Sequence, residues 1–238
     1  MIQSFQQFDS DCSFEFAALD ESKNYRAAIL EDFGPYLTGR VLEVGAGVGQ
    51  FSTELMKLSS VEHLTSIEPS ASFCLNIRKN LPQLNLIEGT VADLPETAAF
   101  HAIFSSNVLE HIETDQDELI AYSHLLQQAN GYLCLFVPAR PEIYAPIDAD
   151  FGHFRRYTRR ELRDKLEIAG FQIVKLRYFN VTGYFAWWLS FCLLKKRSFD
   201  PKAVRFYDRL IFPWVHAFET HVAAPPFGQS LMAVAAAR

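Results

Sequence analysis

The chain has 238 residues and a formal net charge of −6, with 49% hydrophobic and 21% charged residues. This length and composition are typical of one globular domain, so we expect a single domain over residues 1–238. The acidic balance argues against a general nucleic-acid partner, because the phosphate backbone selects basic surfaces.

Cysteine and histidine usage sets further limits. The four cysteines, Cys12, Cys74, Cys134 and Cys192, are scattered without a Cys-x-x-Cys pair, which predicts free thiols in a reducing compartment. The first residues have neither the basic nor the apolar region of a signal peptide, so we expect a cytoplasmic protein. No two histidines have the spacing of a ligand pair, which predicts no metal site.

Upstream of the first strand, apolar positions recur at helical spacing over residues 23–37. They predict a helix within an N-terminal cap of residues 1–38. This helix either covers the edge of the sheet or brings Asn24 and Tyr25 over a bound cofactor.

Residues 41–49, with the sequence VLEVGAGVG, read as a buried strand that runs into a glycine-rich turn. A helix is predicted after it, from Gln50 to Leu58. Glycines permit positive φ angles and let a ligand approach the backbone closely. The stretch therefore predicts a nucleotide-type site. The glycines follow G-x-G-x-G rather than the dinucleotide pattern G-x-G-x-x-G, and Gln50 occupies the place of its third glycine.

Strands and helices then alternate along the chain. Strands are predicted at His63–Ile67, Leu84–Ile87, His101–Ser106 and Tyr132–Val137, with helices at Ser70–Leu81 and Asp115–Ala129. Such alternation indicates a parallel, doubly wound α/β sheet. Right-handed crossovers bring the carboxyl ends of these strands, and the residues that follow them, to one edge of the sheet.

Two acidic residues follow the second and third strands. Glu68, followed by Pro69, lies about 20 residues beyond the glycine turn, where an acid accepts hydrogen bonds from ribose hydroxyls. This spacing does not separate one adenosine cofactor from another, and a solvated acid at a strand end is the alternative. Asp93, which precedes Leu94 and Pro95, is either a ligand contact or an ordinary turn residue.

A long loop is predicted from Pro138 to Tyr157 on the same edge, and loops of this length are usually functional. Its polar side chains include Asp148, His153, Arg155, Arg156 and Tyr157. The two arginines suit a phosphate or carboxylate group of a substrate. The alternative is internal pairing of either arginine with Asp148 or Asp150.

The last third of the chain predicts a helix from Thr158 to Ala169 that opens with a capping box, and strands at Phe171–Tyr178 and Gln229–Ala236. Between those strands, residues 180–228 form an insertion. Its apolar stretch Gly183–Leu194, followed by three basic residues, is too short to span a bilayer. A second stretch, residues 203–222, has helical spacing bent by Pro213. The insertion is a lid or buried helix, an interfacial helix, or the packing surface of a second subunit.

The order of these motifs resembles the class I S-adenosylmethionine (SAM)-dependent methyltransferases, in particular the bacterial UbiE- and UbiG-like small-molecule methyltransferases of the type 11/12 group. The resemblance covers the whole chain. It is carried by Glu43-x-Gly45-x-Gly47-x-Gly49, Asn107–Ile112 (NVLEHI), Gly152–Thr158 (GHFRRYT), Ala169–Phe171 and Pro226–Leu231. One difference is Asn130-Gly131, where many relatives have Pro-Gly-Gly.

The resemblance implies a Rossmann-like, doubly wound sheet of seven strands, mostly parallel with the last strand antiparallel. It implies SAM as cofactor and S-adenosylhomocysteine as product. In this family the glycine turn packs on the amino-acid end of SAM, an acid binds the ribose, and the NVLEHI segment closes the pocket near the methyl group. The implied cofactor contacts are Glu43, Gly45, Ala46, Gly47, Gly49, Glu68, Pro69, Asp93, Leu94, Asn107 and Val108.

The implied reaction is methyl transfer to a small-molecule acceptor. The aromatic insertion favours an apolar or amphipathic acceptor, such as a lipid-linked, quinone-like or fatty molecule, and a saccharide-linked acceptor is the other candidate. Residues 183–197 are a candidate contact with a membrane surface. An oxygen acceptor of high pKa requires a general base, for which His153 is the first candidate and His111 the second. The candidate substrate contacts are Tyr25, His153, Arg155, Arg156 and Tyr157. Both a monomer and a homodimer fit the sequence.

Two other classes of function share parts of this pattern. A NAD-dependent oxidoreductase would share the alternating sheet and Glu68, but the glycine spacing and Glu43 argue against it. A non-catalytic module would keep the methyltransferase fold and use the aromatic insertion as a docking face.

Overall fold

The protein is described by a computed structural model that covers residues 20–95, 97–222 and 224–238. Cys12 and the first half of the predicted N-terminal cap lie outside these residues. One sheet carries seven strands in the order β3-β2-β1-β4-β5-β7-β6. The strands are β1 (Gly39–Val44), β2 (Val61–Glu68), β3 (Asn85–Glu88), β4 (Ala102–Ser106), β5 (Tyr132–Pro138), β6 (Phe171–Phe179) and β7 (Ser230–Ala237).

The five strands β1 to β5 pair in parallel, and β7 runs antiparallel between β5 and β6. The predicted Rossmann-like sheet with an antiparallel last strand is therefore confirmed. Strand β1 lies inside the sheet because Val41, Leu42 and Val44 are apolar on both faces, and all three are buried.

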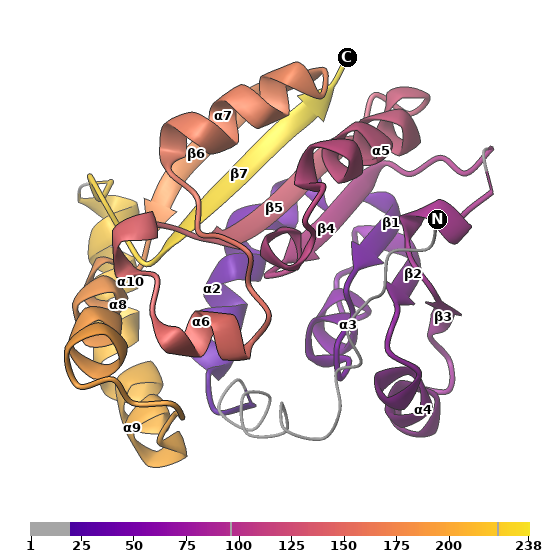
Figure 1. The fold of residues 1–238 in the computed structure, drawn as a ribbon. Helices are drawn as coiled ribbons and strands as arrows, with labels where there is room; N and C mark the ends of the chain where they lie inside the picture. The colour runs from indigo at the N-terminus through magenta and orange to yellow at the C-terminus, as the bar shows by residue number, and fades with distance from the viewer. Residues whose placement is uncertain (1–19, 96, 223) are drawn as a thin grey trace.

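Helices cover both faces of the sheet (Figure 1). The α-helices are α2 (Lys23–Phe33), α3 (Gln50–Leu55), α4 (Ala71–Asn80), α5 (Asp115–Gln127), α6 (Pro146–Asp150), α7 (Arg159–Ile168), α8 (Val181–Trp187), α9 (Pro201–Phe206) and α10 (Phe212–His221). Short 3₁₀ segments are η1 (Gly34–Tyr36), η2 (Val91–Asp93), η3 (Leu109–His111) and η4 (Pro141–Ile143), and η5 (Trp188–Leu193) and η6 (Tyr207–Ile211) are π-helical.

The core is divided by the sheet into two layers. On one face, Tyr122 of α5 and Leu162 of α7 join a buried cluster that includes the strand residues Leu133 and Val137. On the other face, α2 supplies Phe33, whose ring packs edge-on against Phe104 of β4 at 6.0 Å between ring centres. The segments that follow β1 to β4 lie at the carboxyl edge of these strands.

The predicted long loop between β5 and α7 contains more regular structure than its sequence indicated. It includes η4 and the short helix α6. Pro146 begins α6, where its missing N–H costs nothing. Asp148 then accepts a hydrogen bond of 2.8 Å from the backbone N–H of Ala145, which closes the first turn.

The insertion between β6 and β7 is helical, as predicted, and its second part is one continuous helical run that is irregular next to Pro213. It consists of α9, the π-helical η6 and α10. Proline lacks an N–H and clashes with the carbonyl four residues earlier, so Pro213 interrupts the regular hydrogen bonds just where η6 lies. Among the residues that the structure describes, no helix combines the length and the apolar composition needed to cross a membrane.

Replacement of Phe33 by alanine tests the packing of α2 on the sheet. Phe33 is completely buried, and the change leaves a cavity between α2 and β4. We expect the free energy of unfolding to fall by about 3 to 5 kcal/mol. Urea denaturation measures this loss. Ile168→Ala is the control, because 70% of Ile168 is exposed. An equal loss in both variants would contradict the packing described here.

Candidate active site

The glycine-rich turn after β1 has the backbone geometry that its sequence predicts. Gly45, Gly47 and Gly49 have φ angles of 75°, 57° and 85°, in the left-handed region that side chains disfavour. The N–H groups of Gly45 and Ala46 donate to the carbonyl of Ile67, at 2.9 and 3.1 Å. The turn is therefore tied to the end of β2.

The turn also lies against the segment that follows β4. A Cβ atom on Gly45 would come within 2.4 Å of Cγ2 of Val108, so only glycine fits this contact. Asn107 has a φ of 53°, and its N–H donates to the carbonyl of Phe136 at 2.9 Å. The two segments with the strongest sequence resemblance thus pack on each other.

Glu43 lies beneath the turn rather than on its surface. Its carboxylate is buried and accepts hydrogen bonds of 2.6 Å from the hydroxyls of Ser52 and Ser66. Burial raises the pKa of Glu43 to about 7, although these two bonds oppose the rise. Glu43 therefore connects β1, β2 and α3 below the glycines. A direct contact with the cofactor stays a prediction.

Glu68 lies at the end of β2 and joins two backbone segments. Its Oε2 accepts from the N–H of Gly47 at 2.8 Å, and its Oε1 accepts from the N–H of Ser70 at 2.9 Å. Burial raises the pKa of this carboxyl group. A carboxylate oxygen has two lone pairs, so both oxygens keep capacity for ribose hydroxyls. Pro69, the next residue, is exposed.

Asp93 also forms hydrogen bonds within its own turn. Its Oδ2 accepts from the N–H of Thr90 at 2.8 Å and from the Thr90 hydroxyl at 3.1 Å, which stabilises the 3₁₀ turn η2. The side chain is exposed, whereas Leu94 packs partly against the core. The ordinary turn role is therefore present, and the cofactor contacts of Asp93 and Leu94 stay predictions.

His153 in the long loop is oriented by a buried carboxylate. Its Nδ1 lies 2.9 Å from Oδ1 of Asp148, which is completely buried. Burial alone would raise the pKa of Asp148, but the bond from His153 and the charge of Arg156 hold that pKa below its usual value. An ionised carboxylate only accepts hydrogen bonds, so Nδ1 of His153 carries the proton and Nε2 keeps a lone pair.

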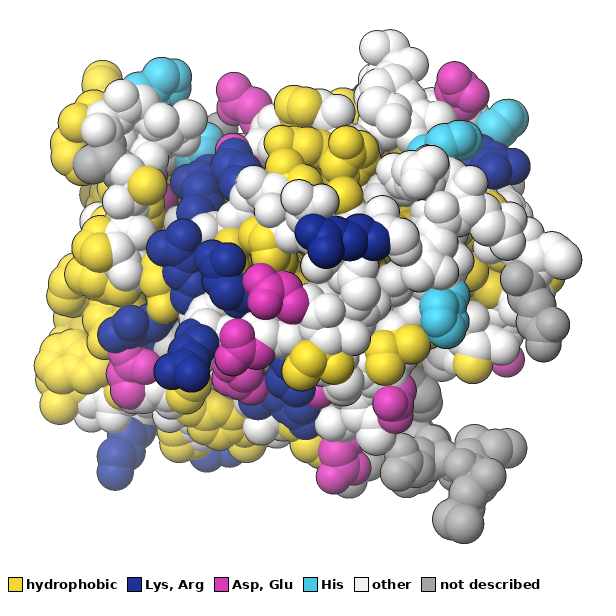
Figure 2. Space-filling model, turned by 90° about the horizontal axis from the view of Figure 1, so that it is seen from above, with side chains coloured by type: hydrophobic (Ala, Val, Ile, Leu, Met, Phe, Trp, Pro, Cys, Tyr) yellow, Lys and Arg dark blue, Asp and Glu magenta, His cyan; other side chains and the backbone are white. Residues whose placement is uncertain are grey.

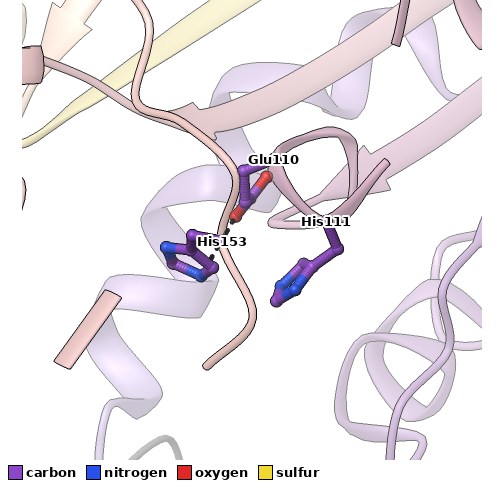
Figure 3. Close-up of side chains that lie close together, drawn as sticks. All are labelled: Glu110, His111 and His153. Carbon is purple, nitrogen blue, oxygen red and sulfur yellow. Dashed lines mark ion pairs between the residues drawn. The ribbon is translucent and has the colours of Figure 1, made fainter. Parts of the chain in front are cut away.

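His153 and His111, the two candidate bases, lie next to each other. Their ring centres are 4.7 Å apart, and Nε2 of His153 is 3.9 Å from Oε1 of Glu110 (Figure 3). The N–H of Phe154 donates to the carbonyl of Glu110 at 2.8 Å and brings the two segments together. Burial lowers the pKa of His111 to about 3, and that of His153 less strongly.

Asp148 and Glu110 complete this cluster. The sequence placed Asp148 among the polar side chains of the loop and Glu110 in the NVLEHI segment, but neither was among the predicted catalytic or binding residues. Asp148 lies five residues before His153, and Glu110 belongs to the NVLEHI segment. The sequence signal for Asp148 was an acid in the same loop as the candidate base His153. Only the fold shows that the loop reaches Glu110.

Glu110, His111 and His153 also have the donor atoms of a metal site, since one ligand atom from each lies within 4.8 Å of the others. The sequence predicted no such group, because its members come from two distant segments. A metal ion would use the Nε2 lone pair of His153 that a base needs, so the two uses exclude each other.

Two of the other predicted substrate contacts in the loop, Arg156 and Tyr157, lie in the interior. Arg156 is buried, with Nε and Nη2 at 2.9 and 2.8 Å from Oδ1 of Asp148, so the predicted alternative of internal pairing is present. The buried hydroxyl of Tyr157 donates to Oδ2 of Asp115 at 2.9 Å. Arg155 is partly exposed and pairs with Asp115 at 2.9 Å. The structure therefore gives each of them an internal partner.

Tyr25 of α2 packs on the face of the sheet that is opposite to α5 and α7. Its ring packs against Phe136, Phe179 and Phe212, at 6.1, 5.2 and 5.0 Å between ring centres. Its hydroxyl lies 3.4 Å from that of Ser230. Burial raises the pKa of this phenol. Of the predicted catalytic and substrate residues, His111 and His153 therefore lie side by side, whereas the ring of Tyr25 packs against three phenylalanines.

Comparison with known proteins agrees with this geometry. Residues 41–131 match the family model of a methyltransferase domain. The chain has no match among curated proteins. Residues 41–131 thus resemble a methyltransferase domain, and the chain shares the fold of solved SAM-dependent methyltransferases. The narrower resemblance to UbiE- and UbiG-like enzymes stays a prediction.

Three solved structures illustrate the likeness in fold. A SAM-dependent methyltransferase from Archaeoglobus fulgidus is 18% identical, with a TM-score of 0.61 over 95% of this chain and 100% of its own. One from Mesorhizobium loti is 15% identical, with a TM-score of 0.61 over 92% and 99%. One from Clostridium acetobutylicum is 10% identical, with a TM-score of 0.60 over 95% and 99%.

The metal content of the purified protein distinguishes the two uses of the histidine cluster. We expect no stoichiometric transition metal, because Asp148 already orients His153 for proton transfer. Mass spectrometry of elements, on protein prepared without chelators, measures this. Stoichiometric Zn²⁺ that is lost in His153→Ala, but kept in the control His63→Ala, would contradict the assignment.

Proposed function

We propose that this protein is an enzyme that transfers the methyl group of SAM to a small-molecule acceptor. The observation that carries the proposal is that the glycine turn, Glu68 and the NVLEHI segment meet at the carboxyl edge of the sheet inside a methyltransferase domain. In open α/β sheets, ligands bind at this edge.

The residues at this edge suit SAM. The left-handed glycines leave space where side chains would stand, as the Gly45–Val108 contact illustrates. Glu68 is oriented by two backbone N–H groups before any ligand arrives, so little entropy is lost when ribose hydroxyls bind. SAM supplies an activated methyl group on a sulfonium, and the protein then orients the acceptor and excludes water.

His153 is the group that would remove a proton from the acceptor. Its Nδ1–H donates to Asp148, which presents the Nε2 lone pair on the side of Glu110 and His111. Because burial lowers its pKa, the imidazole is neutral at pH 7 and ready to accept a proton. Asp148 is a positioning residue, since it acts through His153.

The walls of the site favour an acceptor with an apolar part. Phe151 lies 5.9 Å from the ring of His153 and stacks on Phe199 of the insertion at 6.1 Å between ring centres. These contacts support the lipid-like or saccharide-linked acceptor predicted from the sequence. Arg155 belongs to the loop and is partly exposed, so it is the remaining predicted contact for an anionic group on the acceptor.

Calorimetric titration with S-adenosylhomocysteine tests the proposed cofactor. We expect binding of this product and none of NAD. Glu68→Gln should weaken binding on the order of tenfold or more, because it removes charge-assisted hydrogen bonds to the ribose. Glu88→Gln is the matched control, since Glu88 pairs with Glu68 in strand register and binds Arg78.

Each contrary outcome of this titration has a meaning. Binding of NAD alone would indicate an oxidoreductase. Binding of neither compound would favour the non-catalytic module. Equal effects of the two glutamine variants would remove Glu68 from the cofactor site.

The protonation of His153 is a second test and needs no acceptor. We expect NMR titration of its imidazole to give a pKa below 6.5, so that the base is lost as the pH falls through that value. Asp148→Asn should lower this pKa further, because the bond to Asp148 favours the charged ring. Unchanged ring resonances of the completely buried Tyr122 would show that the variant is folded. A higher pKa in Asp148→Asn would contradict the positioning role.

A further inference from the structure

The outer face of the insertion is unusually apolar. Of the sixteen exposed large hydrophobic side chains among described residues, eleven lie between Phe185 and Val222. Trp214 of α10 is 80% exposed, and Leu210 and Phe206 are 59% and 58% exposed. We call this set, from Phe185 to Val222, the outer face. A concentration of exposed apolar side chains of this kind is typical of a site of contact with a partner or a membrane.

The inner side of the same helices is held by buried acids. Asp208 of η6 accepts from the N–H groups of Asn24 and Tyr25, at 3.0 and 2.9 Å, at the start of α2. Glu219 of α10 accepts from those of Asn180 and Val181, at 2.9 and 2.7 Å, at the start of α8. Carboxylates stabilise helix N-termini. These helices therefore bury two acids, while several of their aromatic side chains are exposed to solvent.

The charge of the insertion is opposite to that of the rest of the chain. Residues 181–222 contain six Lys and Arg and three Asp and Glu, which gives +3, so the rest of the −6 chain carries −9. Lys195 and Lys196 are exposed, and no ion pair within the described residues involves them. Figure 2 shows hydrophobic and basic side chains together along the left edge, where Figure 1 places α8 to α10.

We propose that the outer face docks on a lipid bilayer that carries anionic headgroups. Aromatic side chains among lysines and arginines are typical of interfacial helices, and tryptophan favours the boundary between water and lipid. No described helix crosses a membrane, so the contact is with its surface. A symmetric dimer through this face would bring two patches of the same positive charge together, which disfavours a second copy as the occupant.

Docking would bring the candidate active site close to the bilayer. Trp187 of α8 donates from Nε1 to the carbonyl of Ile143 at 3.1 Å, and the guanidinium of Arg156 lies 4.3 Å from its ring centre. Phe191 of η5 packs in the same cluster as Phe151. The docking itself does not depend on the proposed methyl transfer, and its test uses no activity.

Co-sedimentation of the full chain with lipid vesicles tests the proposal. We expect binding to vesicles of phosphatidylcholine with phosphatidylglycerol, weak binding to phosphatidylcholine alone, and loss of binding at high salt. Leu210→Ser/Trp214→Ser should lower the partition coefficient about tenfold or more. Lys195→Gln/Lys196→Gln/Lys202→Gln should lower it on the order of a hundredfold, at about fivefold for each charge removed.

Two control variants change the same kinds of side chain elsewhere. Leu75→Ser/Ile168→Ser removes apolar groups that are 67% and 70% exposed on α4 and α7. Arg159→Gln/Arg160→Gln/Arg163→Gln removes three charges from α7. Both should bind vesicles as the unmodified protein does. The charge variants alter only surface groups, so they keep the test decisive if the serine variant fails to fold.

Three results would overturn the proposal. The first is the absence of binding to anionic vesicles, and the second is an equal loss of binding in the controls. The third is a dimer in solution that Leu210→Ser/Trp214→Ser converts to a monomer without any change in vesicle binding, which would assign the outer face to a second copy of the chain.

Discussion

The region around the candidate active site depends on one buried carboxylate, that of Asp148. It caps the first turn of α6 at Ala145, orients His153 and pairs with the buried Arg156. A buried charge is tolerated only where its lone pairs are satisfied in this way. Through Arg156, which lies over the ring of Trp187, the same carboxylate connects the long loop to the insertion. The loop, the candidate base and the outer helices therefore form one connected structure.

A second connected unit lies at the glycine turn. Glu43 joins β1 to Ser52 of α3 and Ser66 of β2 from below, and Glu68 joins Gly47 to the start of α4 from the side. Both acids are buried, and burial raises the pKa of each. Buried hydrogen bonds thus fix the conformation of this one turn. Such bonds are expected where a backbone must present a precise surface to a ligand.

The sequence predicted the sheet, and the meeting of the glycine turn, Glu68 and the NVLEHI segment at one edge of it, because the relevant signals are local. Strand ends, glycine spacing and the acid after β2 are read from neighbouring residues, and right-handed crossovers then place them together. The cluster of Glu110, His111 and His153 was beyond such reasoning. It forms because the backbone of Phe154 bonds to Glu110 across more than forty residues of chain.

The sequence pattern did not predict which polar side chains are buried. The sequence by itself determined the alternation of strands and helices, the glycine turn and the helical nature of the insertion, because periodicity and backbone preferences act within a few residues. Only the tertiary structure decided that Arg156 and Tyr157 point inward, and that α10 faces solvent with Trp214 while it buries Glu219. Which side of a helix is buried depends on the partners that other segments supply, such as the N–H groups at the start of α8, and the helix alone does not encode them.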